Sequence, residues 1–599
     1  MEQILTRQEA RREDTWALED LYENEAACRK AAEEVAKKVD SFRQYRQSIG
    51  QGAKELCAAL KAYSSMNQLF ERVYVYANQK LHEDMGNAAS QKLAGDVEVL
   101  ANQLRANTAF LEPEILKLSG ETLEQWVQEE PELLLYRYFL EQILKEKAHT
   151  LSAKEEEVLS RAAEIGQGPS NIYAMFNNAD IAFEDAAGAD GEKFALTQGR
   201  YIQYMESQDR VLRQSAFQNL YKPYRQFANT LASVYDANAR QAAFFAKEHR
   251  YSSAGEAALS ANHIPESVYD QLIEAVHDHL SLLHRYMKVR KKAMKLDEMH
   301  MYDIYVPLVK DVTMQISFEE AKTIVERGLA PLGEEYLSVL KEGFENRWID
   351  VYENKGKRTG AYSWGAYGVH PYVLMNYQGN LNNVFTLAHE MGHALHSYYS
   401  DRKQPYLYAG YSIFVAEVAS TLNESLLIHD LMERTEDKLE KAYLVNYFLE
   451  QFRTTLYRQT MFAEFENLTH RTVKEGGTLT ADDLKEVYGK LNEDYFGPEV
   501  TVDEEIRYEW ARIPHFYTPF YVYQYATGFS AAIAISSKIL KGEPQIVEKY
   551  KEFLSGGSSM TPIELLKLCG VDMTKKEPVT EALQIFDEYL QKMEQLLEL

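Results

Sequence analysis

Apolar residues recur every three or four positions along most of the chain, which is the spacing of amphipathic helices. From Thr15 to Arg161 this pattern fills long segments of Glu, Lys, Ala, Leu and Gln that are broken by short turn signals. The pattern resumes from about Tyr201 to Leu296, and again from Asn380 to the end of the chain. It therefore predicts a mainly α protein of packed helices.

Two segments interrupt the helical pattern and predict short strands. In the first, the dipeptide Asp190-Gly191 offers turn geometry between short apolar runs, which predicts a β-hairpin and a soft domain boundary near residue 200. In the second, from Trp348 to Asn380, Tyr, Val and Trp alternate with Gly and Pro. An extended segment beside a site can pair with a substrate backbone, although a plain edge hairpin explains this composition equally well.

Composition and charge exclude several classes of protein. The 599 residues include few helix breakers, with Gly 30 and Pro 15, which favours helices. Asp and Glu number 91 against 65 Lys and Arg, a net charge of −26, so we expect no nucleic-acid or membrane partner. The three cysteines form no CxxC pair, and the amino-terminal segment lacks the apolar core of a signal peptide. These features predict a cytoplasmic protein without a disulfide framework.

The segment from Ile513 to Ser537 contains no Asp, Glu, Lys or Arg and is long enough to span a bilayer. Two prolines, a histidine and several tyrosines within it would place many polar groups in hydrocarbon. We therefore expect a buried helix beside a cleft.

The strongest chemical signal is an H-E-x-x-H motif, formed by His389, Glu390 and His393. On a helix the two imidazoles share one face and can bind a single zinc ion, with Glu390 placed to act on the metal-bound water. The motif is short enough to arise by chance. Here, however, both histidines lie opposite the apolar stripe of the predicted helix, which argues against buried core histidines.

A zinc peptidase site needs a third protein ligand and an open position for water. His396 lies about 10 Å along the helix axis from His389, too far to share the metal. Glu417 follows His393 by 24 positions, which allows a loop and a second, antiparallel helix, so it is the candidate third ligand. Glu424, two turns further on, is a candidate acceptor that would orient a ligand imidazole.

The uncharged segment from Ile513 to Ser537, called the late segment below, supplies further hydrogen-bond donors. If the chain is helical after Pro519, Tyr521 and Tyr525 lie at positions i and i+4, with His515 in the preceding turn. Phenol and imidazole groups suit a developing oxyanion on a tetrahedral intermediate. A tyrosine stripe that packs as core is an equally good explanation of this pattern.

Several strings, taken together, resemble the bacterial oligoendopeptidase F branch of the thimet-oligopeptidase-like zinc peptidases. The resemblance runs from about Ile181 to the carboxyl terminus, and the matching strings are Tyr302 to Leu308, Trp348 to Arg358, Gly360 to Ser363, Leu387 to His396 and Phe414 to Thr421. It implies a helical ellipsoid of zincin type with a deep central channel, which admits short peptides and excludes folded proteins. A few short strands would lie beside the zinc helix.

The resemblance also implies roles for individual residues. His389, His393 and Glu417 would bind one zinc ion per chain, and Glu390 would be the general base. A His/Tyr pair from the late segment would stabilise the intermediate, and Gly360, Ala361 and Tyr362 would line the cleft as a strand. The chain would then divide into an N-terminal helical domain over residues 1–200 and a catalytic domain over residues 201–599.

The function expected from these features is hydrolysis of internal bonds in short, unfolded peptides. Two alternatives stay open, a zinc carboxypeptidase of similar helical build and a helical peptide-binding protein whose zinc is structural or absent. The second is disfavoured because structural zinc sites are closed by four protein ligands, whereas three converge here by spacing. The sequence predicts neither the oligomeric state nor the preferred peptide sequence.

Overall fold

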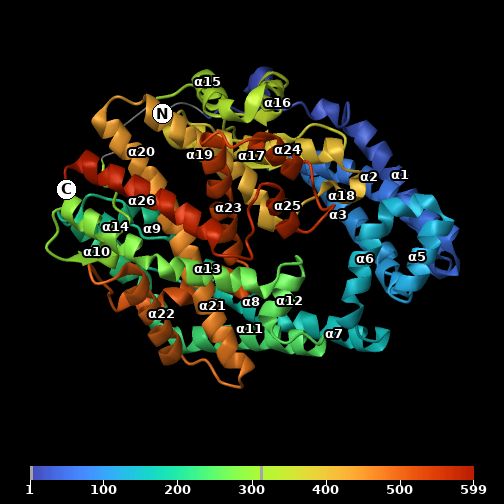
Figure 1. Cartoon of the computed structure of the whole chain (residues 1–599), viewed down its shortest axis with the longest axis horizontal. Helices are drawn as coiled ribbons and strands as arrows, with labels where there is room; N and C mark the ends of the chain where they lie inside the picture. The colour runs from blue at the N-terminus through green and yellow to red at the C-terminus, as the bar shows by residue number, and fades with distance from the viewer. Residues whose placement is uncertain (1–3, 310–314) are drawn as a thin grey trace.

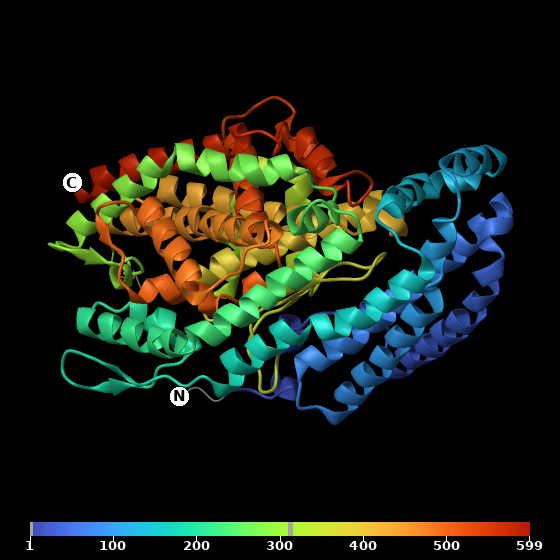
Figure 2. The ribbon, with the colours of Figure 1, turned by 90° about the horizontal axis from the view of Figure 1, so that it is seen from below.

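The computed structural model describes residues 4–309 and 315–599 and confirms a mainly α fold. The N-terminal helices gather at one end of an elongated molecule, as Figures 1 and 2 show from two sides. Their bounds are α1 Glu25–Phe42, α2 Ala53–Glu83, α3 Ala88–Thr108, α4 Leu111–Ile115, α5 Gly120–Glu129, α6 Arg137–Lys145 and α7 Ala153–Gly166. Helix α8 (Gly168–Met175) lies in the larger body, where it packs against α11 (Ala228–Glu248) (Figure 1).

The predicted hairpin follows α8. Strands β1 (Ala186–Ala187) and β2 (Lys193–Phe194) pair antiparallel across a turn that contains Gly191 at φ 82°, a value in the left-handed region that favours glycine. The next helices are α9 Gln198–Met205, α10 Arg210–Gln226, α11 Ala228–Glu248, α12 Ala254–Ser260, α13 Glu266–Asp278, α14 Leu280–Ala293, α15 Phe318–Gly328 and α16 Gly333–Glu345.

The remaining helices form most of the larger body (Figure 1). They are α17 Leu381–Lys403, α18 Tyr406–Ala409, α19 Ile413–Arg434, α20 Lys438–Gln451, α21 Arg458–Lys474, α22 Ala481–Phe496, α23 Tyr523–Leu540, α24 Ile546–Leu554, α25 Pro562–Leu568 and α26 Glu577–Leu597. Strands β3 (Met299–His300) and β7 (Val500–Thr501) form a short parallel pair, and Met299 and Val500 belong to the core of this body. Of the uncharged segment from Ile513 to Ser537, residues 523–537 lie in α23, and no helix within the described residues has the length and apolar character that a membrane span requires.

Strands form where the sequence predicts them between Trp348 and Asn380. Strand β6 (Tyr372–Leu374) pairs parallel with β4 (Ile349–Asp350) and antiparallel with β5 (Tyr362–Trp364), so β5 is at one edge. Alternate residues of β6 point to opposite faces, as in any strand. Tyr372 and Leu374 join the apolar core of the N-terminal helices, whereas Val373 joins the core of the larger body. The sheet therefore lies between the two cores.

A buried cluster of ion pairs joins the N-terminal segment around Arg7 and Trp16 to this sheet. Asp350 of β4, fully buried, pairs with Lys357 at 2.7 Å and with Arg7 at 2.6 Å. Arg7 also reaches Glu83 of α2 at 2.9 Å, and the Trp16 indole N–H donates to the same carboxylate. These contacts fix the sheet relative to α2. The largest core contains residues from Tyr173 to Met593, but the division at residue 200 stays a prediction.

Candidate active site

The two helices that bear the H-E-x-x-H motif and Glu417 pack against each other very closely. Helix α17 begins where the Asn380 side chain accepts a hydrogen bond from the Asn383 N–H, and it packs along α19. At their contact stands Gly392, where an added Cβ would lie 2.7 Å from the Ser420 Cα and 2.7 Å from the Ala419 carbonyl oxygen. The missing side chain therefore permits the approach that brings both helices to one site.

Three donor atoms converge at this contact. The Nε2 atoms of His389 and His393 are 3.2 Å apart, and Glu417 Oε2 lies 3.6 Å from the first and 3.7 Å from the second. A point about 2.0 Å from all three atoms exists, which matches zinc bonds of about 2.0–2.2 Å to imidazole and carboxylate. The donor set thus fits one metal ion. The three donor atoms define a plane, and one face of this plane is left for a water molecule.

Glu424 accepts a hydrogen bond from His389 Nδ1, which leaves Nε2 of this imidazole facing the other two donors. Its second oxygen accepts from Gln451 Nε2 at 2.7 Å. Burial opposes a charge on His389, but the hydrogen bond and charge of Glu424 outweigh it and raise the pKa of His389. Burial and the neighbouring His389 lower the pKa of His393. The electrostatics therefore disfavour two charged imidazoles side by side.

Glu390 is buried, with 7% of its surface exposed, and one carboxylate oxygen has no hydrogen-bond partner in the described chain. Burial raises the pKa of Glu390 to about 7, while the adjacent His389 acts in the opposite direction. A carboxylate with such a pKa accepts and returns a proton near neutral pH. His396, fully buried, stacks on the Tyr411 ring with centroids 3.7 Å apart and is not among the converging donors.

The late segment reaches the same site, but its helix begins later than the sequence predicts. Helix α23 starts at Tyr523, so Tyr521 precedes it and does not share a helix face with Tyr525. The rings of His515, Tyr521 and Tyr525 still form a group, with centroids 5.6 to 6.3 Å apart. Burial raises the pKa of Tyr525, and Tyr521 and the charge of Glu417 add to this rise. Helix α23 itself lies against Glu417, since a Cβ added at Gly528 would be 3.6 Å from the Glu417 Cβ.

The strand expected to line the cleft lies beside the zinc-motif helix. Strand β5 contacts α17, and its outer edge has no strand partner within residues 4–309 and 315–599. Gly360 and Ala361, which the sequence predicts as part of the strand, precede it, because β5 begins at Tyr362. Gly360 adopts φ 85°, a left-handed value that a strand does not contain, and its carbonyl accepts from Asn376 at 2.9 Å. Ala361 is half-buried, while the Tyr362 hydroxyl lies 2.7 Å from His82 of α2. The side chain of Tyr362 is thus engaged within the protein, and its backbone is at the edge.

A cavity of about 520 Å³ adjoins this strand. Its walls include Ser363 and Trp364 of β5, Ser397 and Asp401 of α17, and Glu71 of α2. It therefore opens between the N-terminal helices and the helix that bears the two histidines. Its volume is within the range typical of ligand sites.

Comparison with known proteins places the chain in a family. Residues 203–585 match the model of peptidase family M3, more than half of the chain, and residues 114–183 match that of oligopeptidase F. The chain belongs to peptidase family M3. It is 48% identical to oligopeptidase PepF of Bacillus subtilis, with 99% of this chain and 89% of the relative covered. It is 41% identical to the plasmid-borne oligoendopeptidase F of Lactococcus lactis subsp. cremoris, with 91% of each covered.

Solved M3 relatives share the fold. The oligoendopeptidase F of Enterococcus faecium has a TM-score of 0.74 at 38% identity, over 95% of this chain and 98% of that one. A crystal structure from Chlamydophila abortus has a TM-score of 0.93 at 35% identity, over 99% and 100%. These likenesses confirm the predicted family and its helical zincin-type fold. As an M3 peptidase, the protein is a metallopeptidase that acts on internal peptide bonds.

The sequence does not predict two features of this M3 peptidase site. Gln451, at the end of α20, holds Glu424 although 27 residues separate them. Phe520, just before Tyr521, adopts φ 56°, which delays the start of α23. Neither residue belongs to a motif. Gly392 does lie inside the H-E-x-x-H motif, and a glycine there signals a close helix approach.

Proposed function

We propose that the protein is a zinc-dependent oligoendopeptidase that hydrolyses internal bonds of short, unfolded peptides. In this proposal His389, His393 and Glu417 hold one zinc ion, and Glu424 orients the first imidazole. The main support is the convergence of three donor atoms within 3.2 to 3.7 Å of one another. Members of the family are generally zinc-dependent, and imidazole and carboxylate ligands suit this metal.

Glu390 would act as the general base. A bound zinc ion supplies Lewis acidity and a water molecule of lowered pKa. Glu390 accepts a proton from the attacking water and donates it to the nitrogen of the leaving amine as the peptide bond breaks. Its burial beside the three donors and its carboxylate oxygen without a partner in the described chain support this double role. The mechanism forms no covalent intermediate with the protein.

Tyr521, Tyr525 and His515 would donate hydrogen bonds to the oxyanion of the tetrahedral intermediate. Support comes from their grouped rings and from the packing of α23, which carries Tyr525, against Glu417. Burial lowers the pKa of His515, so its imidazole is neutral at pH 7 and still donates one N–H.

The substrate would lie along β5. Its free edge can add a peptide as an extra strand, which is recognition through backbone groups and suits peptides of many sequences. Tyr362 of β5 would present this backbone, with Gly360 and Ala361 just before the strand, and the adjoining cavity of about 520 Å³ would receive neighbouring side chains.

One experiment separates this proposal from its alternatives. A short internally quenched peptide with both termini blocked is incubated with wild type, with chelator-treated wild type, and with Glu390→Gln. We expect cleavage at an internal bond that a chelator abolishes and that zinc restores. Glu390→Gln should bind zinc normally and lose turnover by at least about a hundredfold.

Other outcomes favour other functions. Cleavage only of peptides with a free carboxyl end would indicate a carboxypeptidase. Peptide binding without cleavage would indicate a binding protein. Near wild-type turnover of Glu390→Gln in the chelator-sensitive assay would contradict the assignment of the base.

The proposal extends to domain organisation and location. Residues 1–200 would form a helical domain closed by the hairpin, and residues 201–599 the catalytic domain. The three cysteines, Cys28, Cys57 and Cys569, are unpaired and buried, which is compatible with a reducing compartment and supports the cytoplasm as the place of action.

A further inference from the structure

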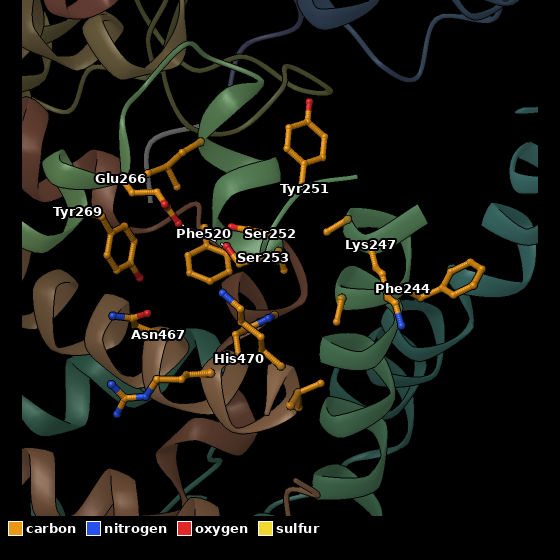
Figure 3. Close-up of a pocket in the computed structure, with 18 of the residues that line it drawn as sticks. Phe244, Lys247, Tyr251, Ser252, Ser253, Glu266, Tyr269, Asn467, His470 and Phe520 are labelled. Atoms are coloured by element: carbon orange, nitrogen blue, oxygen red, sulfur yellow. Dashed lines mark hydrogen bonds between the residues drawn. The ribbon is translucent and has the colours of Figure 1, made fainter. Parts of the chain in front are cut away.

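A cavity of about 760 Å³ lies among α11, α12, α13 and α21, outside the metal site (Figure 3). It shares no residue with the three converging donors, with Glu390, or with the rings of His515, Tyr521 and Tyr525. The peptidase mechanism described above therefore leaves this cavity without a role.

Positive side chains surround the cavity. Lys247 of α11 and both Arg471 and Lys474 of α21 line it, and none of the three makes an ion pair within residues 4–309 and 315–599. A fourth cation, Arg240, is already held by Asp236 at 2.6 Å. The acidic residues in the wall are Glu266 and Asp270. In a chain with a net charge of −26, a cavity wall with more cations than anions is unexpected.

A buried histidine in the wall lacks a partner. His470 is 6% exposed and lines the cavity below Phe520 in Figure 3, yet neither ring nitrogen has a hydrogen-bond partner in the described chain. Buried polar groups in proteins are nearly always hydrogen-bonded. Burial lowers the pKa of His470 to about 4, so at neutral pH the ring is uncharged and has one N–H to donate. The missing acceptor is one that a ligand can provide.

We propose that this cavity is a second ligand site, which binds a small organic or inorganic anion with a carboxylate or phosphate group. Arg471, Lys474 and Lys247 supply charge, and the His470 N–H supplies a directed hydrogen bond. Carboxylate and phosphate both accept such bonds and share the negative charge that the wall selects. A cleaved peptide with a new carboxyl terminus and free phosphate are two sources of this chemistry.

The site has a physical link to the late segment. The Phe520 ring is held between His470, with centroids 4.9 Å apart, and Gly255, where an added Cβ would lie 3.2 Å from the ring. The Phe520 N–H donates to Glu466 at 3.0 Å, and the next residue is Tyr521. A ligand that contacts His470 and Phe520 therefore restrains the segment that precedes α23. The consequence for catalysis rests on the proposed role of Tyr521, but binding itself does not.

Binding can be measured without turnover. Inorganic phosphate is titrated calorimetrically, at constant ionic strength, into the zinc-loaded full-length protein and into the same protein after chelation. We expect one phosphate per chain with the same Kd in both states. Binding that disappears when the metal is removed would place the phosphate at the metal site and overturn the proposal.

Variants then locate the site. Arg471→Gln combined with Lys474→Gln should raise the Kd at least tenfold. The matched control, Arg46→Gln combined with Lys30→Gln, removes the same charge from two exposed cations of the N-terminal region that make no ion pair with the rest of the described chain, and it should leave the Kd unchanged. An equal rise of the Kd in both double variants would show that phosphate responds to the overall charge of the protein, and it would refute the site.

A second variant tests the histidine. His470→Phe preserves a ring against Phe520 and removes the N–H, so it should raise the Kd severalfold while the melting temperature reports whether the fold is intact. In wild type, phosphate should slow amide hydrogen exchange across residues 515–523. Unchanged exchange with saturated phosphate would refute the link to this segment.

A third arm distinguishes the sources of the anion. An N-acetylated dipeptide with a free carboxyl group is compared with its carboxamide, and phosphate is then added as a competitor. Binding of the acid alone, with competition by phosphate, identifies a shared anion site that accepts peptide products. If neither phosphate nor the acid binds at up to about 10 mM, tenfold above a Kd of about 1 mM, the proposal is wrong.

Discussion

Substitution of Gly392 by alanine tests whether the close approach of α17 and α19 builds the metal site. The new Cβ would lie 2.7 Å from the Ser420 Cα and from the Ala419 carbonyl oxygen, whereas carbon atoms pack best at about 3.5–4.0 Å. The helices must therefore separate by at least about 0.8 Å. Because these contacts are to backbone atoms, no side-chain rotation can relieve them.

The displacement is large for a metal site. Distances between a metal ion and its ligand atoms stay within about 0.2 Å of their usual values. A movement of Glu417 by about 0.8 Å relative to the histidines therefore removes its carboxylate from bonding distance. We expect zinc affinity to fall at least tenfold, and the free energy of unfolding of the metal-free protein to fall by about 1–3 kcal/mol from overpacking. Peptide hydrolysis at limiting zinc should fall in parallel with the affinity.

The assay is competition for zinc with a chromophoric chelator, together with urea unfolding of the metal-free protein. The matched control is Gly528→Ala on α23, where the added Cβ would lie 3.6 Å from the Glu417 Cβ, an ordinary contact. This variant should change zinc affinity by less than about threefold. Wild-type zinc affinity and hydrolysis in Gly392→Ala would refute the argument that this glycine sets the helix separation.

Three further perturbations test other parts of the structure. Glu424→Ala should weaken zinc binding by about 10–100-fold, and Gln451→Ala by less, because the second removes only the partner that holds the carboxylate. Glu466→Gln should flatten the pH dependence of stability. Burial raises the pKa of Glu466 to about 8, against about 4.3 in the unfolded chain. The free energy of unfolding of wild type therefore falls as pH rises through this window, by at most about 1.4 kcal/mol per unit. Asp350→Ala leaves Lys357 buried without its partner and should lower the free energy of unfolding by about 3–5 kcal/mol, measured in urea.

Each of these expectations has a contrary result. Equal zinc affinities for Glu424→Ala and wild type would show that the imidazole of His389 needs no external orientation. An unchanged slope of stability against pH in Glu466→Gln would show that this carboxyl is not protonated in the folded state. A loss in Asp350→Ala no larger than that in Asp494→Ala, which breaks an exposed pair, would show that the buried cluster is not structural.

Much of the fold was predictable because helix formation here depends on local pattern. The hairpin after α8, the strands between Trp348 and Asn380, and the pairing of α17 with α19 all follow from apolar spacing and turn residues. The spacing of 24 residues between His393 and Glu417 predicted two helices joined by a connection, and the structure adds the short helix α18 within that connection. Local signals therefore predicted which residues approach one another, and the roles of those residues remain the proposal tested above.

Contacts between distant segments were not predictable in the same way. Gln451 reaches Glu424 from another helix, and the buried pair of Asp350 with Arg7 joins residues 343 positions apart. Such partners are fixed by the packing of whole helices, and a polar residue that will be buried looks the same in sequence as one that is solvated. The charge of −26 likewise gave no indication of a local cluster of cations, because net charge is a sum over the whole surface.

Phe520 shows how one backbone angle changes both sites. Residues other than glycine rarely adopt positive φ, and an aromatic side chain gives no sequence signal for it, so a helix from Pro519 onward was the reasonable expectation. The observed φ of 56° ends that continuity. It turns the Phe520 ring toward His470 and leaves Tyr521 ahead of the helix, facing the rings of His515 and Tyr525. Because one residue contributes to the wall of the second cavity and precedes Tyr521 directly, a ligand in that cavity would be linked mechanically to the proposed oxyanion donors.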